Sequence, residues 1–159
     1  MVMLSIITVG TLKEDYLKDA VQEYKKRLLQ YARVEEINIK EETIKNEDDA
    51  SEVSRALKLE GEKILARTPK DAAVIALCVE GRQFDSPALA EKIREMQNDK
   101  GKITLIIGSS HGLSDEVKAR ADLRLSLSKL TFPHQLMRPV LLEVIYRSFT
   151  IIAGKKYHK

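Results

Sequence analysis

Continuous apolar runs alternate with helix-spaced apolar positions along the chain. The runs at residues 3–9, 34–39, 72–79 and 103–107 predict strands, as do the alternating leucines at 123–127. Apolar residues recur every three or four positions over residues 12–31, 53–65 and 89–96 and again from Pro133 to about Ile152, which predicts amphipathic helices. The alternating order predicts an α/β domain with a mainly parallel sheet and helices on both faces.

Helix-ending and helix-starting residues refine these boundaries. Ser86 is expected to cap the third helix, with Pro87 at its first position, where the missing N–H does no harm. A further short helix is expected after Ser114. For the last helix two starts remain open. Pro139 would kink a helix that begins at His134, but it fits in the first turn of one that begins near Arg138.

Composition narrows the class of protein. The 159 residues, 43% apolar and 32% charged, predict a single globular domain over residues 1–159 with a charged exterior. A lone cysteine, Cys78, excludes a disulfide framework and favours a reducing, cytoplasmic location. Residues 1–10 lack the basic flank of a signal peptide, and no apolar run reaches the roughly 18 residues that a membrane span needs. A membrane protein is therefore not expected.

Charge is unevenly distributed. Residues 1–125 carry 21 Lys and Arg against 23 Asp and Glu, whereas residues 126–159 carry six basic residues against the single acid Glu143. This basic stretch also contains the aromatic residues Phe132 and Tyr157, a combination that can hold phosphates by charge and bases by stacking. The alternatives are a solvated helix face with a frayed tail and, for Glu143 with Arg147, an ordinary exposed ion pair.

A glycine-containing loop at residues 107–113 follows a predicted buried strand and precedes a helix. Ligands of open α/β sheets bind beyond the carboxyl ends of strands, so this loop is a candidate binding site. It lacks the Gly-Lys-Ser/Thr of a P-loop and the glycine spacing of a dinucleotide site. A plain turn that needs glycine is equally compatible with the spacing, and no metal set surrounds His111.

Three segments resemble the signature of the RlmH family, bacterial methyltransferases of the SPOUT superfamily that act on a pseudouridine of 23S ribosomal RNA. They are residues 125–138 (LSLSKLTFPHQLMR), residues 142–147 (LEVIYR) and the terminal Tyr-His-Lys. The loop at residues 107–112 takes the place of the family's Ile-Gly-Gly-x-x-Gly, with Ser109 at the second glycine. If that position has a positive φ, serine is strained there. Pro139 and Val144 also depart from the family pattern.

The resemblance implies a fold, a cofactor and partners. It implies a C-terminal deep trefoil knot that forms the S-adenosylmethionine (SAM) pocket, and a homodimer that completes the active site. The reaction would methylate N3 of a pseudouridine in the helix 69 loop of 23S ribosomal RNA, on the assembled ribosome and without a metal. The implied cofactor contacts are Leu77, Gly108, Leu127, Ser128, Lys129, Leu130, Thr131 and Phe132.

Roles in catalysis follow from the same resemblance. His158 would lie nearest the chemistry as base or hydrogen-bond partner, and Tyr157 would stack on or orient the target base. Arg147, fixed by Glu143, would hold carbonyl oxygens or phosphates. The expected RNA contacts are Arg138, Lys155, Lys156 and Lys159. Two other functions stay open: a non-catalytic RNA- or ribosome-binding module that uses the basic tail, and a small phosphate-ester enzyme, which the lack of clustered aspartates disfavours.

Overall fold

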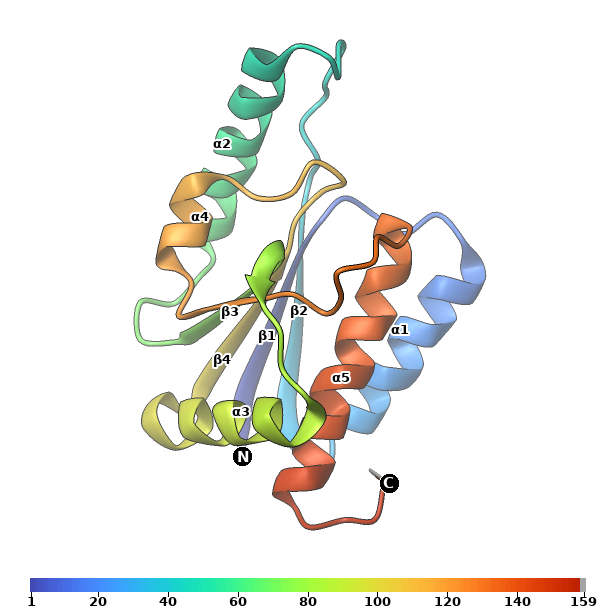
Figure 1. Ribbon diagram of the computed structural model, residues 1–159, viewed down its shortest axis with the longest axis vertical. Helices are drawn as coiled ribbons and strands as arrows, with labels where there is room; N and C mark the ends of the chain where they lie inside the picture. The colour runs from blue at the N-terminus through green and yellow to red at the C-terminus, as the bar shows by residue number, and fades with distance from the viewer. Residues whose placement is uncertain (158–159) are drawn as a thin grey trace.

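A computed structural model describes residues 1–157, which form a parallel sheet with helices on both faces (Figure 1). The strands are β1 (Val2–Val9), β2 (Ala32–Ile39), β3 (Ala73–Arg82), β4 (Lys102–Ile107) and β5 (Leu123–Leu125). The helices are α1 (Asp15–Leu28), α2 (Ala50–Ala66), α3 (Ser86–Lys100), α4 (Asp115–Arg120) and α5 (Met137–Ile152). The strand order is β2-β1-β4-β3-β5, and every neighbouring pair is parallel. The α/β prediction is confirmed.

The central strands β1, β3 and β4 bury both of their faces over most of their length. Successive side chains of a strand point to opposite sides of a sheet, so each of these strands contributes to two cores. On one side Ile6 and Leu105 pack in a core that includes side chains of α1, α3 and α5. On the other side Ile7 and Ile106 pack with Ile64 of α2 and with residues of α4. The nearly uninterrupted apolar runs in the sequence follow from this two-sided burial.

Several boundaries differ from the predicted ones. The N-cap of α3 is Asp85, whose carboxylate accepts a hydrogen bond of 2.8 Å from the Ala88 N–H, so the Ser86 prediction was wrong by one residue. The last helix begins at Met137 after a single 3-10 turn, His134–Leu136, which places Pro139 in its first turn without a kink. β5 ends at Leu125, and Leu127 lies in the following loop rather than in the strand.

The chain after β5 crosses the sheet before it reaches α5. In Figure 1, this segment, residues 126–136, passes behind the end of β3 on its way to the helix. Contact is close at the crossing: the Ser126 N–H donates a hydrogen bond of 3.0 Å to the Arg82 carbonyl oxygen. A Cβ on Gly81 would lie 2.7 Å from the carbonyl oxygen of Arg124, so only glycine leaves room here.

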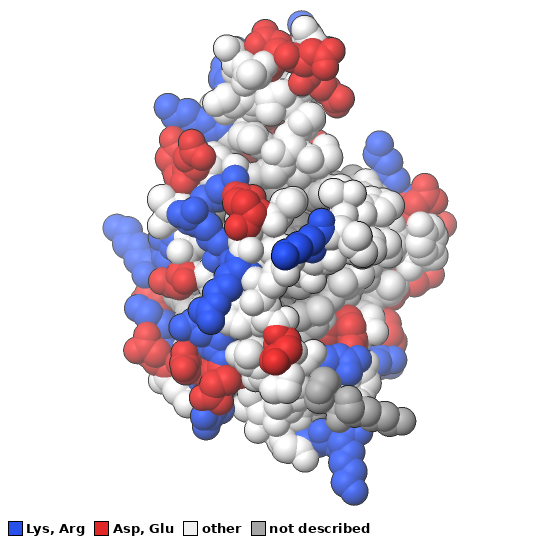
Figure 2. Space-filling view, in the orientation of Figure 1, with Lys and Arg blue, Asp and Glu red and all other residues white. Residues whose placement is uncertain are grey.

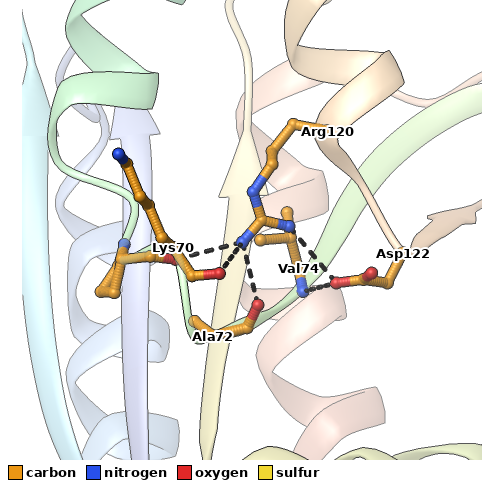
Figure 3. Close-up of polar contacts among 6 residues, drawn as sticks. Lys70, Ala72, Val74, Arg120 and Asp122 are labelled. Carbon is orange, nitrogen blue, oxygen red and sulfur yellow. Dashed lines mark hydrogen bonds and ion pairs between the residues drawn. The ribbon is translucent and has the colours of Figure 1, made fainter.

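Arg120 at the end of α4 ties the edge strand β5 to its neighbour β3 (Figure 3). Its Nη2 donates to the carbonyl oxygens of Pro69, Lys70 and Ala72 at 3.0–3.3 Å. Asp122, which pairs with Arg120, accepts a hydrogen bond of 2.8 Å from the Val74 N–H (Figure 3). The short β5 therefore has its register fixed at its start, and this register determines where the following loop emerges. Within residues 1–157 no helix combines the length and apolarity of a membrane span.

Candidate functional site

A cavity of about 310 Å³ lies at the carboxyl ends of β3 and β4, a size within the range of small-molecule sites, roughly 300–1,000 Å³. Three segments enclose it: the end of β3, the glycine loop and the segment after β5. The lining residues used below are Leu77, Cys78, Glu80, Gly108, Ser109, Ser110, Lys118, Leu127, Ser128, Leu130, Thr131, Phe132, His134 and Met137. The cavity therefore lies where the sequence analysis expected a ligand of an open α/β sheet, beyond the carboxyl ends of the strands.

The glycine loop is closed on itself. The Gly112 N–H donates a hydrogen bond of 2.9 Å to the Ser109 carbonyl oxygen, and Gly112 itself has φ +94°. A Cβ on Gly108 would collide with the Gly112 carbonyl oxygen, so this position admits only glycine. No residue other than glycine among residues 1–157 has a positive φ, and the strain considered for Ser109 is therefore absent. Ser109 is buried, and its Oγ accepts from the His111 N–H.

The segment after β5 forms the outer wall of the cavity through a serine-stabilised turn. Ser126 Oγ donates to the Ser128 carbonyl oxygen at 3.2 Å, and Ser128 Oγ accepts from the Leu130 N–H at 3.0 Å. Leu130 is 73% exposed and Phe132 46% exposed at this wall. Figure 2 shows basic side chains gathered over α4 beside a largely uncharged surface over this segment and α5.

Seven of the eight residues expected to contact a cofactor line this one cavity. They come from all three walls, so the structure brings together positions that are up to 55 residues apart in sequence, Leu77 and Phe132. Lys129 is the exception, since it is exposed and does not belong to the lining. Cofactor contact itself stays a prediction for all eight.

The sequence did not predict a role in a binding site for five further lining residues: Cys78, Glu80, Lys118, His134 and Met137. Lys118 Nζ lies 2.6 Å from Glu80 Oε1, and this pairing lowers the pKa of Glu80 and raises that of Lys118. Burial raises the pKa of the Cys78 thiol, which keeps it neutral. His134 and Met137 lie within the motif that carries the resemblance, but for Lys118 the sequence offers no signal.

Glu143 and Arg147 on α5 meet Tyr157, which follows the helix, away from the cavity. Arg147 Nη2 lies 2.5 Å from Glu143 Oε1, and the Tyr157 hydroxyl donates a hydrogen bond of 2.9 Å to Glu143 Oε2. The Arg147 guanidinium lies 4.7 Å from the centre of the Tyr157 ring. None of the three lines the cavity of the described chain. His158, the predicted base, and Lys159 lie outside the described residues.

The segment before the last two residues is docked on the fold, so the description as a frayed tail does not hold for residues 155–157. Lys155 Nζ donates to Gln30 Oε1 at 2.9 Å and lies 5.0 Å from the centre of the Tyr31 ring. The Tyr157 ring meets the Tyr146 ring edge-on, with centroids 5.0 Å apart. Lys155 and Lys156 are both exposed.

Arg138 was expected to contact RNA. In the structure only 6% of its surface is exposed. Its Nη2 donates to the carbonyl oxygens of Val9 and Gly10 at 2.6 and 2.9 Å. The guanidinium joins the start of α5 to the end of β1, which is a structural role inside the chain, and contact of Arg138 with RNA stays a prediction.

Comparison with known proteins places the chain in a family. Residues 2–158 match the family model described as "Predicted SPOUT methyltransferase". The chain is 47% identical to the ribosomal RNA large subunit methyltransferase H of Shouchella clausii and 49% identical to that of Caldicellulosiruptor bescii. The first alignment covers 98% of this chain and 99% of the relative, and the second covers 99% and 100%.

A solved structure from Legionella pneumophila, in complex with the bound cofactor SAM, shares the fold with a TM-score of 0.51 at 15% identity. The match covers 95% of this chain, which spans 66% of that structure's length. The full-length match to the family model and the close relatives agree with each other and with the parallel sheet. The chain therefore belongs to the RlmH family of SPOUT methyltransferases.

Proposed function

We propose that this chain transfers the methyl group of SAM to N3 of a pseudouridine in the helix 69 loop of 23S ribosomal RNA. The observation that carries the proposal is the cavity at the strand ends, whose three walls hold seven of the eight expected cofactor contacts. The names of the close relatives support a large-subunit ribosomal RNA as substrate. A substrate on the assembled ribosome would place the protein in the cytoplasm.

The cavity suits the shape and chemistry of SAM. Leu77, Leu127 and Met137 offer apolar surface, while the glycine loop offers backbone groups at close range because Gly108 has no side chain. When bound, the cofactor supplies an electrophilic methyl group on a sulfonium. The residues of the chain bind and orient it and exclude water from the reacting atoms.

The acceptor atom, N3 of pseudouridine, must lose a proton before it can react. N3 of pseudouridine carries a hydrogen between two carbonyl groups, so its electron pair becomes available only when that proton leaves to a base. N3 then forms the new bond to the methyl carbon, and the electron pair of the broken carbon–sulfur bond stays on sulfur. Hydrogen-bond donors at the two carbonyl oxygens stabilise the charge that develops on the base.

A homodimer would bring the predicted catalytic residues of one protomer to the predicted cofactor cavity of the other. Glu143 and Arg147 lie on α5 and Tyr157 lies after it, all three outside the cavity of their own chain. The C-terminal segment of a second protomer, with its His158, would then serve the cofactor cavity of the first. We also propose that the passage of residues 126–136 behind the end of β3 is the crossing of the implied trefoil knot.

Transfer of label from SAM to ribosomes tests the proposal. Ribosomes carrying pseudouridine at the target site should gain one methyl group each, and ribosomes carrying uridine there should gain none. Equal labelling of both would remove the pseudouridine specificity. The His158→Ala variant should lose transfer at saturating ribosomes; full activity would remove the proposed role of His158. Calorimetry that detects no SAM binding would favour the non-catalytic RNA-binding module instead.

A further inference from the structure

A second cavity of about 750 Å³ adjoins the cofactor cavity. Ser109, Ser110 and His134 line both cavities and form the wall between them. The other walls come from the β1–α1 loop, the end of β2 and residues 133–138. The proposed cofactor does not occupy this space, which lies directly beside the proposed site of methyl transfer.

The second cavity is built by long-range contacts rather than by loose loops. Gln135 accepts a hydrogen bond of 3.0 Å from the Lys13 N–H and donates one of 3.4 Å to the Thr11 carbonyl oxygen. Arg138, which belongs to the same segment as Gln135, donates a hydrogen bond of 2.9 Å to the Gly10 carbonyl oxygen. The β1–α1 loop is therefore fixed by side chains from the far end of the chain, and the cavity is preorganised.

Its chemistry matches a nucleotide. Tyr16 lines the cavity with 67% of its surface exposed, as an aromatic ring that stacks on a base must be. Lys13 and Lys40 are exposed lining residues, and within residues 1–157 neither takes part in an ion pair, so both are available for phosphates. Glu14 and Glu41 also line the cavity and can accept hydrogen bonds from N–H or hydroxyl groups of base and ribose.

His134 is the polar side chain on the shared wall. Its buried Nε2 has no hydrogen-bond partner among the described residues, and a buried polar atom in this state is uncommon. Burial and the nearby charge of Arg138 lower the pKa of His134, while Glu41 and the Gly108 carbonyl oppose this shift. The imidazole is therefore neutral at pH 7, and a neutral ring nitrogen can accept or donate a hydrogen bond to the edge of a base.

We propose that this second cavity is the subsite for the target nucleotide. The base stacks on Tyr16, its edge meets His134 beside the methyl group, and its phosphates lie against Lys13 and Lys40. The inference rests on the function proposed above and names where the RNA enters. A base that reacts within a recessed cavity must leave the helical stack, and an aromatic platform with flanking cations is what receives an extruded nucleotide.

Steady-state methylation with labelled SAM, on ribosomes that carry pseudouridine at the target site but not yet its methyl group, tests the subsite. Tyr16→Ala should raise KM for ribosomes about 10-fold, since base stacking on one ring contributes an effect of this order. Tyr16→Phe, which keeps the ring, should restore the wild-type value. Calorimetry should give the same Kd for SAM with all three proteins. The exposed Lys26 on α1 lies outside the lining, so Lys26→Ala serves as a control for Lys13→Ala and Lys40→Ala, which should each raise KM.

Three results would overturn the inference, each in a distinguishable way. An unchanged KM for Tyr16→Ala, with wild-type protein active, would remove the subsite and leave the proposed function standing. Dissociation of a wild-type dimer by Tyr16→Ala in sedimentation would show that a second copy of this chain occupies the cavity. Wild-type protein that labels no ribosomes would remove the proposed function and this subsite together.

Discussion

The Tyr157 hydroxyl donates a hydrogen bond to the carboxylate of Glu143, 14 residues earlier in the chain. The same carboxylate accepts from Arg147, so one acid holds both a tyrosine and an arginine. The chain must turn back after α5 to make this contact, and the Tyr157 ring then lies against the Tyr146 ring. Glu143 thus determines where the last described residues lie.

Replacing Glu143 by glutamine should change the alkaline behaviour of the protein. Burial raises the pKa of Tyr24, and the hydrogen bond and charge of Glu143 raise it further, to about 12. A tyrosine whose pKa is raised in the folded state stabilises the fold fully at a pH below about 10, the ordinary pKa of the unfolded chain. This contribution is lost as the pH rises to about 12. In Glu143→Gln, tyrosinate should form at lower pH, and the free energy of unfolding should decline less steeply over this interval.

Spectrophotometric titration of tyrosinate and urea unfolding at several pH values measure both effects. Glu91→Gln is the matched control, because Glu91 also binds an arginine, Arg94, but on α3 and at an exposed site. It should leave the tyrosine titration unchanged. An unaltered titration in Glu143→Gln would contradict the role assigned to this carboxylate.

Gly108→Ala should abolish SAM binding. The added Cβ collides with the Gly112 carbonyl oxygen, so the glycine loop has to open where the cofactor is expected to lie. Calorimetry with SAM measures the loss, and thermal unfolding shows whether the fold survives.

Gly101→Ala provides the comparison for this substitution. Gly101 has φ +67° at the end of α3, and a Cβ added there would have nothing within 4 Å. Alanine there should cost about 1 kcal/mol of stability through the left-handed backbone and leave SAM binding intact. If both variants bind SAM equally well, Gly108 does not shape the cofactor site.

Arg138→Met should destabilise the fold by about 2–4 kcal/mol, because the carbonyl oxygens of Val9 and Gly10 lose charged hydrogen-bond donors in a buried place. Urea unfolding measures this change. Arg94→Met, at an exposed ion pair, should leave the free energy of unfolding close to that of the wild type. If Arg138→Met leaves the free energy of unfolding unchanged, the guanidinium has a role other than joining β1 to α5.

Lys156→Ala should weaken binding to ribosomal RNA and flatten its dependence on salt. Lys156 is exposed, and the loss of one phosphate contact lowers the slope of log affinity against log salt by about 0.7–0.9. Filter binding over a range of salt concentrations measures the slope. Lys26→Ala, also exposed, should retain the full slope. Equal slopes for the two variants would take Lys156 out of the RNA interface.

The buried strands were the part of the fold most accessible to prediction. β1 and β4 differ from their predicted ranges by one residue each, because strands with both faces covered leave unbroken apolar runs. β5 was predicted too long, since Leu127 continues the alternation although its backbone has left the sheet. Asp85 and Ser86 are both good cap residues, so sequence alone could not decide between them.

The site was predictable only in part, for a physical reason that Arg138 illustrates. Its charge is visible in the sequence, but the carbonyl oxygens that bury it lie 128 and 129 residues away. Lys118 is likewise placed at the cavity by α4, and its partner Glu80 lies on β3. Motif positions could be carried over from the family resemblance, whereas contacts between distant segments had to come from the structure.

The crossing of residues 126–136 behind the end of β3 sets an order of assembly. The outer wall of the cofactor cavity belongs to a segment that is synthesised after β3 and β4, and we expect that segment to take its place only once those strands are available to receive it. A chain that ends before residue 126 would contain the glycine loop but lack this wall of the cavity. Cofactor binding can therefore serve as a readout of finished folding, and refolding followed by SAM uptake should show its slowest step when this last segment docks.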